Sequence, residues 1–110
     1  FGSGSLPLYD GTSMAKNQDV IVVTFNYRTN VFGFPSSHDL PLTGNNLGYL
    51  DQELALKWVQ DNIVMFGGDP TKVTIMGQSA GAQSVSDAIV RHTPSGAPFR
   101  AGIMLSGASV

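Results

Sequence analysis

Residues 72–86 have the sequence KVTIMGQSAGAQSVS, in which a serine lies between two glycines, Gly77 and Gly81. Two explanations are possible. The segment is either a glycine-rich turn that happens to contain a serine, or the sharp strand-to-helix bend on which a nucleophilic serine is mounted. The pattern Gly-x-Ser-x-Gly alone is weak evidence, because it arises by chance in chains rich in glycine and serine. The choice depends on whether a strand precedes Ser79 and a helix follows it.

The residues on either side of Ser79 have the patterns that such a bend requires. Residues 72–76 form a short run typical of a strand, and residues 80–91 predict a helix with one apolar side. The predicted helix stops before the Thr-Pro-Ser-Gly sequence at residues 93–96. A strand, a serine and a helix follow one another without a loop, which favours the nucleophile bend over a plain glycine turn.

A tight bend also explains the small residues around the serine. A strand that turns directly into a helix forces the residue at the corner into a sparsely populated backbone conformation, which costs about 1–3 kcal/mol. We expect Gly77, Gln78 and Gly81 to support this elbow, and a Cβ atom at either glycine to collide with the adjoining strand and helix. The bend would present the Ser79 oxygen at the carboxyl end of the sheet, where the Ala80 N–H can stabilise an oxyanion.

Further apolar segments complete an alternation of strands and helices. Residues 20–25, VIVVTF, form a continuous run typical of a strand buried on both faces of a parallel sheet. A loop over residues 28–48 leads to a long amphipathic helix over residues 50–66, which Gly67 and Gly68 end. Residues 102–107 predict a last strand. The order β-α-β-α-β predicts an α/β fold, the core of an open sheet with parallel strands.

Composition excludes several classes of function. The chain has 110 residues, 42% of them hydrophobic, and a formal net charge of -2. Its six Lys and Arg residues are scattered along the sequence, so we expect no nucleic-acid partner. No apolar run approaches the roughly 18 residues that a membrane span requires. The absence of cysteine excludes disulfides and thiol nucleophiles within this stretch but says little about the compartment.

Longer motifs resemble the type-B carboxylesterases, the branch of the α/β-hydrolases that includes the cholinesterases and several fungal lipases. They run in order over nearly the whole chain: NYR at 26–28, VFGF at 31–34, GNNLGYLDQ at 44–52, ALKWVQDNI at 55–63, FGGDP at 66–70 and VTIMGQSAG at 73–81. The SGSLPLYDG sequence at residues 3–11 is most similar to fungal members. Together these motifs are far more specific than the pentapeptide.

The resemblance implies an ester hydrolase that acts through a Ser-His-acid triad and an acyl-enzyme, with Ser79 as the nucleophile. It also implies that the oxyanion glycines lie before Phe1 and that the triad acid and histidine lie after Val110, so only the Ala80 amide can be assigned here. Because the chain also starts without Met, we expect residues 1–110 to be a single partial domain, the central part of a catalytic domain. We expect this fragment to be inactive alone. The resemblance suggests secretion, whereas the oligomeric state stays open.

One position departs from the family pattern. The residue before the nucleophile is usually Glu in the family, and here it is Gln78. In cholinesterases that carboxylate lies near the cationic head of the substrate. A neutral amide argues against choline esters, so we expect a small neutral ester as the substrate.

Other chemically capable side chains have simpler structural explanations. His92 and Asp87 lie far along the helix that starts after Ser79, and their side chains cannot return to its oxygen. His38 lies in the long loop, where a solvated turn residue is the simplest interpretation. Two separated histidines and dispersed carboxylates give no metal-ligand spacing, and the opening Gly-Ser-Gly-Ser lacks the Lys-Ser/Thr of a phosphate loop. We therefore expect no cofactor and no metal.

Three residues are expected to serve the fold. Asp51 either caps the long helix or pairs with Arg28, as the family resemblance suggests. Trp58 lies on the apolar stripe of that helix and is expected in the core.

A function of another class stays open, because the family also includes non-catalytic adhesion and protein-binding domains. Those relatives commonly replace the serine. The presence of Ser79 between both glycines favours the enzyme.

Overall fold

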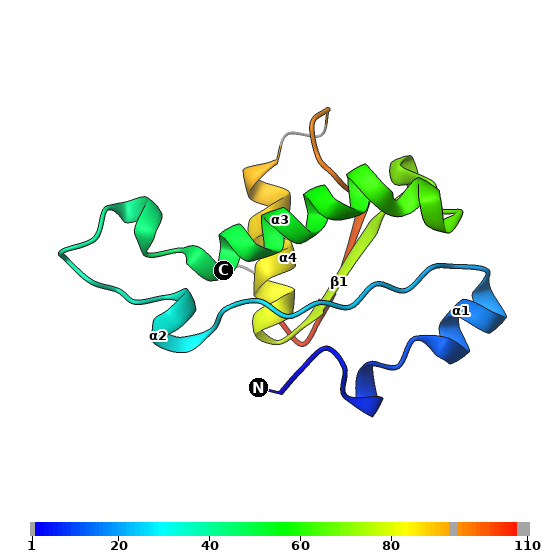
Figure 1. Ribbon diagram of the computed structural model, residues 1–110, viewed down its shortest axis with the longest axis horizontal. Coiled ribbons are helices and arrows are strands. Elements are labelled where there is room, and N and C mark those ends of the chain that lie inside the picture. The colour runs from blue at the N-terminus through cyan, green and yellow to red at the C-terminus, as the bar shows by residue number, and fades with distance from the viewer. Residues whose placement is uncertain (1, 93–94, 108–110) are drawn as a thin grey trace. The chain divides into compact units, whose positions relative to one another are not determined.

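The computed structural model describes residues 2–92 and 95–107, and the chain divides into two compact units, Phe1–Ala55 and Leu56–Val110. The elements follow in the order α1 (Thr12–Gln18), α2 (Asn30–Gly33), α3 (Leu47–Asn62), β1 (Thr74–Gln78), α4 (Ala80–Arg91) and β2 (Ala101–Leu105) (Figure 1). Short 3-10 turns lie at Pro7–Tyr9, Leu42–Gly44, Ile63–Phe66 and Pro70–Lys72. None of the described helices is long and apolar enough to span a membrane.

The second unit contains the predicted strand–helix–strand sequence. β1 and β2 pair in parallel, with Gln78 opposite Leu105 at the carboxyl end, and α4 packs against both strands (Figure 1). The buried side chains of α4 recur every three residues, at Ala82, Val85 and Ala88, and with Ile63 they form the core of this unit. The predicted parallel α/β arrangement is therefore confirmed here.

Hydrogen bonds join the start of β1 to its surroundings. The Asp69 carboxylate accepts from the Thr71 N–H at 2.9 Å and from the Thr71 Oγ1 at 2.6 Å, which forms the turn before the strand. These hydrogen bonds lower the pKa of Asp69 below its ordinary value. Gln60 of α3 donates its Nε2 to the carbonyl oxygens of Pro70 and Pro98, both at 2.9 Å. The turn into β1 and the loop into β2 are thus held by one side chain.

The α-helix α3 ends at Asn62, short of the predicted end at residue 66, and the 3-10 turn Ile63–Phe66 continues it to the predicted glycine pair. The position of Trp58 also differs from the prediction. Gly67 adopts a φ of 84° and ends the 3-10 turn that continues α3, as the Gly67-Gly68 pair predicts. Trp58 was expected in the core, yet its exposed fraction is 45%. Its ring packs against that of Phe66, with centroids 5.8 Å apart. The apolar stripe of α3 therefore remains largely uncovered among the described residues.

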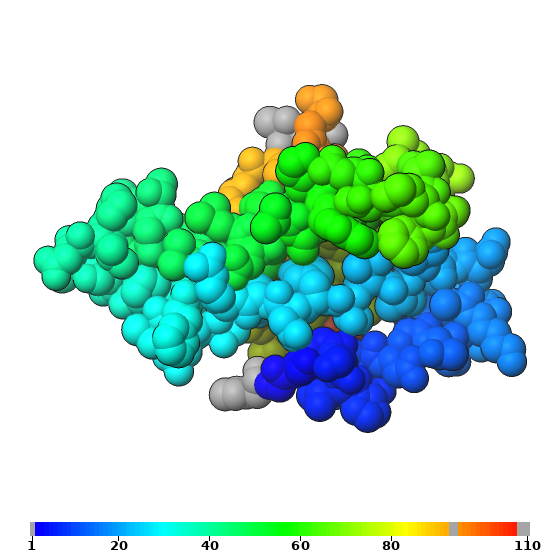
Figure 2. Space-filling view, in the orientation of Figure 1, coloured from blue at the N-terminus to red at the C-terminus, as the bar shows by residue number. Residues whose placement is uncertain are grey.

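The first unit has helices but no strand among its described residues. Residues 20–25, predicted as a strand, make no ladder hydrogen bonds there. A strand is defined by backbone groups that pair with a neighbouring strand, and no described segment supplies that neighbour. The five apolar side chains of this run are 37–45% exposed, and the segment is visible along its length in Figure 2. The first β element of the predicted order is therefore absent from the structure.

Side chains organise the loops of the first unit instead. The Asn45 Oδ1 accepts from the Ser37 N–H at 2.8 Å, and its Nδ2 donates to the Ser37 carbonyl at 3.2 Å. The Asn26 Oδ1 accepts from the Gly4 N–H at 2.8 Å. The predicted loop over residues 28–48 also contains the short helix α2, which the sequence did not indicate.

Candidate active site

Ser79 is the single residue between β1 and α4. Its φ of 54° and ψ of -116° lie outside the regions that residues with a side chain ordinarily occupy. Its N–H donates to the Leu105 carbonyl at 2.9 Å, and its carbonyl accepts from the Gln83 N–H at 3.0 Å. The strained corner is therefore held by β2 on one side and by α4 on the other.

The Ser79 side chain is accessible. The residue is exposed, its side chain does not cap α4, and no hydrogen bond engages its Oγ among the described residues. This arrangement differs from an ordinary helix N-cap, where the serine oxygen accepts a hydrogen bond from the first turn. The hydroxyl is left available to an incoming molecule.

The first amides of α4 lie beside the serine. Ala80 begins this twelve-residue helix, so its N–H has no acceptor within the helix, and no other described residue accepts from it. The aligned peptide dipoles place partial positive charge at this end of the helix. Ser79 and Ala80 thus present a free hydroxyl and a free amide from adjacent positions.

The two glycines of the elbow differ in what they contribute. A Cβ atom added at Gly77 would overlap the carbonyl group of Gly81, so Gly77 has to lack a side chain for α4 to lie where it does. A Cβ atom at Gly81 would meet nothing within 4 Å. The expectation of a collision at Gly81 is therefore wrong, because its Cβ direction points away from β1. The steric demand for a glycine exists at Gly77.

Gln78 is the last residue of β1 and is exposed. Side chains alternate between the two faces of a strand, so Gln78 lies on the face opposite to Gly77 and thus away from α4. Its side chain is uncharged at any ordinary pH, and it precedes the serine directly.

Sequence reasoning missed the contribution of the segment after β2. Ser106 has a φ of 54°, like Ser79, and the two serines follow register partners in neighbouring strands. A Cβ atom at the next residue, Gly107, would lie 2.8 Å from the Ser79 carbonyl oxygen and 3.0 Å from the Ala82 Cβ. The available signal was the parallel pairing itself, which places the residues after Leu105 beside those after Gln78.

The histidine of the second unit, His92, does not lie at the serine. His92 follows the last residue of α4, roughly 18 Å along the helix axis from its start at 1.5 Å per residue. Its ring makes an edge-to-face contact with Phe99, with centroids 5.8 Å apart. His38 is an exposed residue of the first unit. Among the described residues, no group of three His, Asp or Glu side chains is arranged to hold a metal ion.

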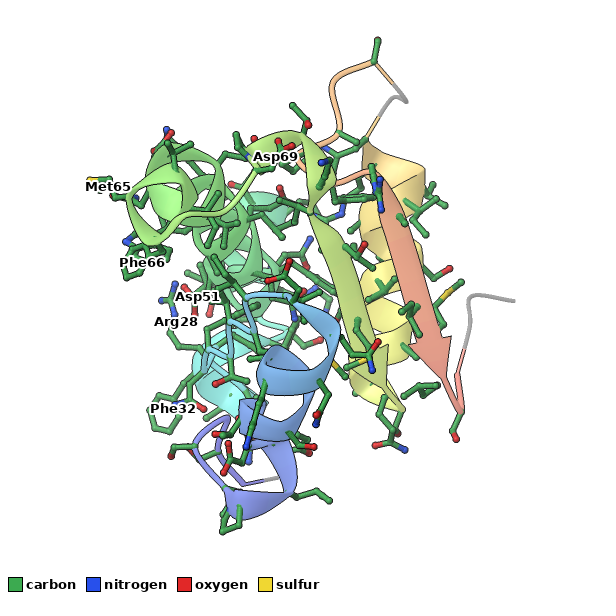
Figure 3. The ribbon with its side chains drawn as sticks, turned by 90° about the vertical axis from the view of Figure 1, so that its right-hand side faces the viewer. Arg28, Phe32, Asp51, Met65, Phe66 and Asp69 are labelled. Atoms are coloured by element: carbon green, nitrogen blue, oxygen red, sulfur yellow. The ribbon has the colours of Figure 1, made fainter. Side chains whose placement is uncertain are left out.

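The expected ion pair of the first unit is present (Figure 3). Arg28 Nη2 lies 2.7 Å from Asp51 Oδ1, while Arg28 Nε and the Arg28 N–H donate to Asp51 Oδ2 at 2.8 and 2.9 Å. The side-chain hydrogen bonds from Arg28, with that of its backbone N–H, lower the pKa of Asp51 to about 2. Asp51 is the fifth residue of α3, so it does not cap the helix. It joins α3 to the chain before α2.

Comparison with known proteins assigns the family. The chain matches the carboxylesterase family over residues 1–110. It belongs to the carboxylesterase family. The chain is 49% identical to the para-nitrobenzyl esterase of Bacillus subtilis over 109 residues, which cover 98% of this chain and 22% of that protein. It is 48% identical to the acetylcholinesterase of Electrophorus electricus, over 96% of this chain and 17% of that protein.

Solved carboxylesterase structures have the same backbone arrangement. The carboxylesterase of Geobacillus stearothermophilus, crystallised at pH 6.2, superposes with a TM-score of 0.86 at 50% identity, over 98% of this chain and 23% of that one. A thermophilic para-nitrobenzyl esterase gives a TM-score of 0.88 at 48% identity, over 100% of this chain and 23% of that one. The chain thus has part of the α/β-hydrolase fold and spans about a fifth of the length of its curated relatives.

Proposed function

We propose that this chain is the central part of a type-B carboxylesterase catalytic domain, and that Ser79 is its nucleophile. The observation that carries the proposal is the Ser79 corner, with a φ of 54°, an exposed side chain and no partner for its Oγ among the described residues. Strained backbone persists only where the surrounding structure holds it, and here two backbone hydrogen bonds do so. Family membership supports ester hydrolysis as the reaction.

The proposed reaction has two stages. The Ser79 Oγ attacks the ester carbonyl carbon as a base takes its proton, and the carbonyl oxygen becomes an oxyanion facing the Ala80 N–H. The bond to the alcohol oxygen then breaks, the alcohol leaves with the proton, and the acyl group stays on Ser79. Water attacks this acyl-enzyme with the help of the same base. The carboxylic acid departs, and Ser79 regains its proton.

The base must come from elsewhere in the full-length protein. His92 is placed at the wrong end of α4, and its ring packs against Phe99. Without a base, a serine hydroxyl is a weak nucleophile at neutral pH. We therefore expect ester hydrolysis from the full-length protein and none from residues 1–110 alone.

Neutral esters are the proposed substrates. Gln78 adjoins the nucleophile at the end of β1 and adds no negative charge that would attract a cationic alcohol group. Gln78→Glu in the full-length protein should raise kcat/KM for a choline ester relative to an uncharged ester of the same acyl chain. An unchanged ratio would remove this substrate preference while leaving the esterase proposal intact.

The direct test is kinetic and uses p-nitrophenyl butyrate with the full-length protein. A burst of nitrophenol equal to the enzyme concentration reports the acyl-enzyme. Ser79→Ala should reduce kcat on the order of 10⁴- to 10⁶-fold, because the nucleophile of a triad is lost. Ser95→Ala is the matched control, since Ser95 is an exposed turn residue, and it should retain the wild-type rate. Wild-type activity in Ser79→Ala would contradict the proposal.

A further inference from the structure

The segment that follows β2 contacts the backbone of the proposed nucleophile. The Leu105 carbonyl accepts the Ser79 N–H at 2.9 Å and so extends the β1–β2 ladder by one residue, into the corner itself. Ser106 then turns the chain with a φ of 54°. Gly107 then lies against the Ser79 carbonyl, which belongs to the peptide group between Ser79 and Ala80.

The contact at Gly107 leaves no space for a side chain. A Cβ atom there would lie 2.8 Å from the Ser79 carbonyl oxygen and 3.0 Å from the Ala82 Cβ. Neither neighbour is the free end of a flexible side chain. Ala82 is fully buried, and the Ser79 carbonyl is fixed by the Gln83 N–H at 3.0 Å. A methyl group at Gly107 therefore has to displace the backbone of Ser79, the Gly107 turn, or both.

We propose that Gly107 is a positioning residue for the nucleophile, and this inference rests on the proposed function of Ser79. Because Gly107 has no side chain, the turn after β2 can lie against the Ser79 carbonyl. This contact fixes the position of the Ser79 hydroxyl relative to the Ala80 N–H. Alignment of the attacking oxygen with the oxyanion donor governs the chemical step, and a misplacement of about 1 Å can cost roughly 10²-fold in rate. A shift of about half that size predicts roughly a 10-fold loss.

Gly102 of β2 provides the matched control. A Cβ atom there would meet the Val85 Cγ1 at 2.9 Å and the Ile89 Cδ1 at 3.0 Å, in the core between β2 and α4. These contacts are with side-chain methyl groups and involve no atom of Ser79. Gly102→Ala should therefore lower stability through the core alone, whereas Gly107→Ala should act on the nucleophile.

The test compares the two variants in the full-length protein. We would measure the thermal midpoint, kcat and KM for p-nitrophenyl butyrate, and the inactivation rate constant with a fluorophosphonate, all well below the midpoint. Gly107→Ala should lower kcat and the inactivation rate by about 10-fold with KM little changed. Gly102→Ala should lower the midpoint and keep both rates within about 2-fold. Equal kinetic losses in both variants would overturn the proposal.

A second variant keeps the test informative if Gly107→Ala folds poorly. Adding Ala82→Gly removes the 3.0 Å neighbour and keeps the 2.8 Å contact with the Ser79 carbonyl oxygen. The double variant should still show the kinetic loss, and normal rates in it would overturn the role of the Ser79 contact. A wild-type protein without esterase activity would instead refute the proposed function. A wild-type esterase with a normal Gly107→Ala variant would refute only this inference.

Discussion

The two units of the chain are held together in different ways. In the second unit, the β1–β2 ladder and the buried face of α4 fix the backbone around Ser79, while side-chain hydrogen bonds hold the turn into β1 and the loop into β2. In the first unit, side chains fix the backbone through Asn26, Asn45 and the Arg28–Asp51 pair, and no strand ladder forms among the described residues. The comparison teaches that the strained corner at Ser79 is held by backbone hydrogen bonds from β2 and α4, which constrain its position more tightly than side-chain contacts would.

The substitution with the largest expected effect is Gly77→Ala, which tests the backbone support of the second unit. The added methyl group would overlap the Gly81 carbonyl, so α4 would have to move away from β1. We expect a loss of at least 1–3 kcal/mol in unfolding free energy, the usual range for overpacking, and a fall of more than about 100-fold in kcat. Urea unfolding of the full-length protein measures the change in unfolding free energy, and hydrolysis of p-nitrophenyl butyrate measures the change in kcat.

Gly81→Ala is the matched comparison for Gly77→Ala. The added Cβ would lie in open space, so the losses of unfolding free energy and of kcat should both be much smaller than in Gly77→Ala. Equal losses at the two positions would show that the backbone around Ser79 is less constrained than the structure indicates.

Substitutions in the Arg28–Asp51 pair test whether side-chain contacts stabilise the first unit. The pair's three hydrogen bonds join residues that are distant in sequence, so Arg28→Gln and Asp51→Asn should each lower stability, and their effects should not add. A double-mutant cycle by urea unfolding of the full-length protein measures this coupling. The kcat of the folded variants should stay near that of the wild type. Strict additivity would mean that the pair contributes nothing.

The same pair predicts a pH dependence. Arg28 holds the folded-state pKa of Asp51 at about 2, below its ordinary value of 3.8. The carboxylate therefore stabilises the folded state fully above about pH 4, and this contribution is lost as the pH falls toward 2. The stability difference between wild type and Asp51→Asn should shrink over that interval. A difference that stays constant from pH 5 to pH 2 would contradict the lowered pKa.

The elements of the second unit could be predicted from the sequence because each is encoded by a local pattern of neighbouring residues. The β-type run before Ser79, the apolar spacing of Val85 and Ala88, and the last apolar run indicated β1, α4 and β2 within about two residues. Gly77 was correctly predicted to be sterically required. These features depend on local periodicity and on the geometry of one turn.

The errors concern contacts that periodicity does not encode. Residues 20–25 have the composition of a buried strand, but a strand forms only where a neighbour pairs with it. Trp58 lies on an apolar stripe that the described residues leave partly open. Gly81 was misjudged because spacing does not tell which way a Cβ points. Gly107 was missed because its contact with Ser79 arises only after β1 and β2 pair.

The most direct test of the central claim is active-site labelling of the full-length protein with a fluorophosphonate, followed by peptide mapping. We predict one phosphonyl group per chain, attached to Ser79, and complete loss of labelling in Ser79→Ala. An active esterase that carries the label on a different serine, or none, would contradict the assignment of Ser79 as the nucleophile.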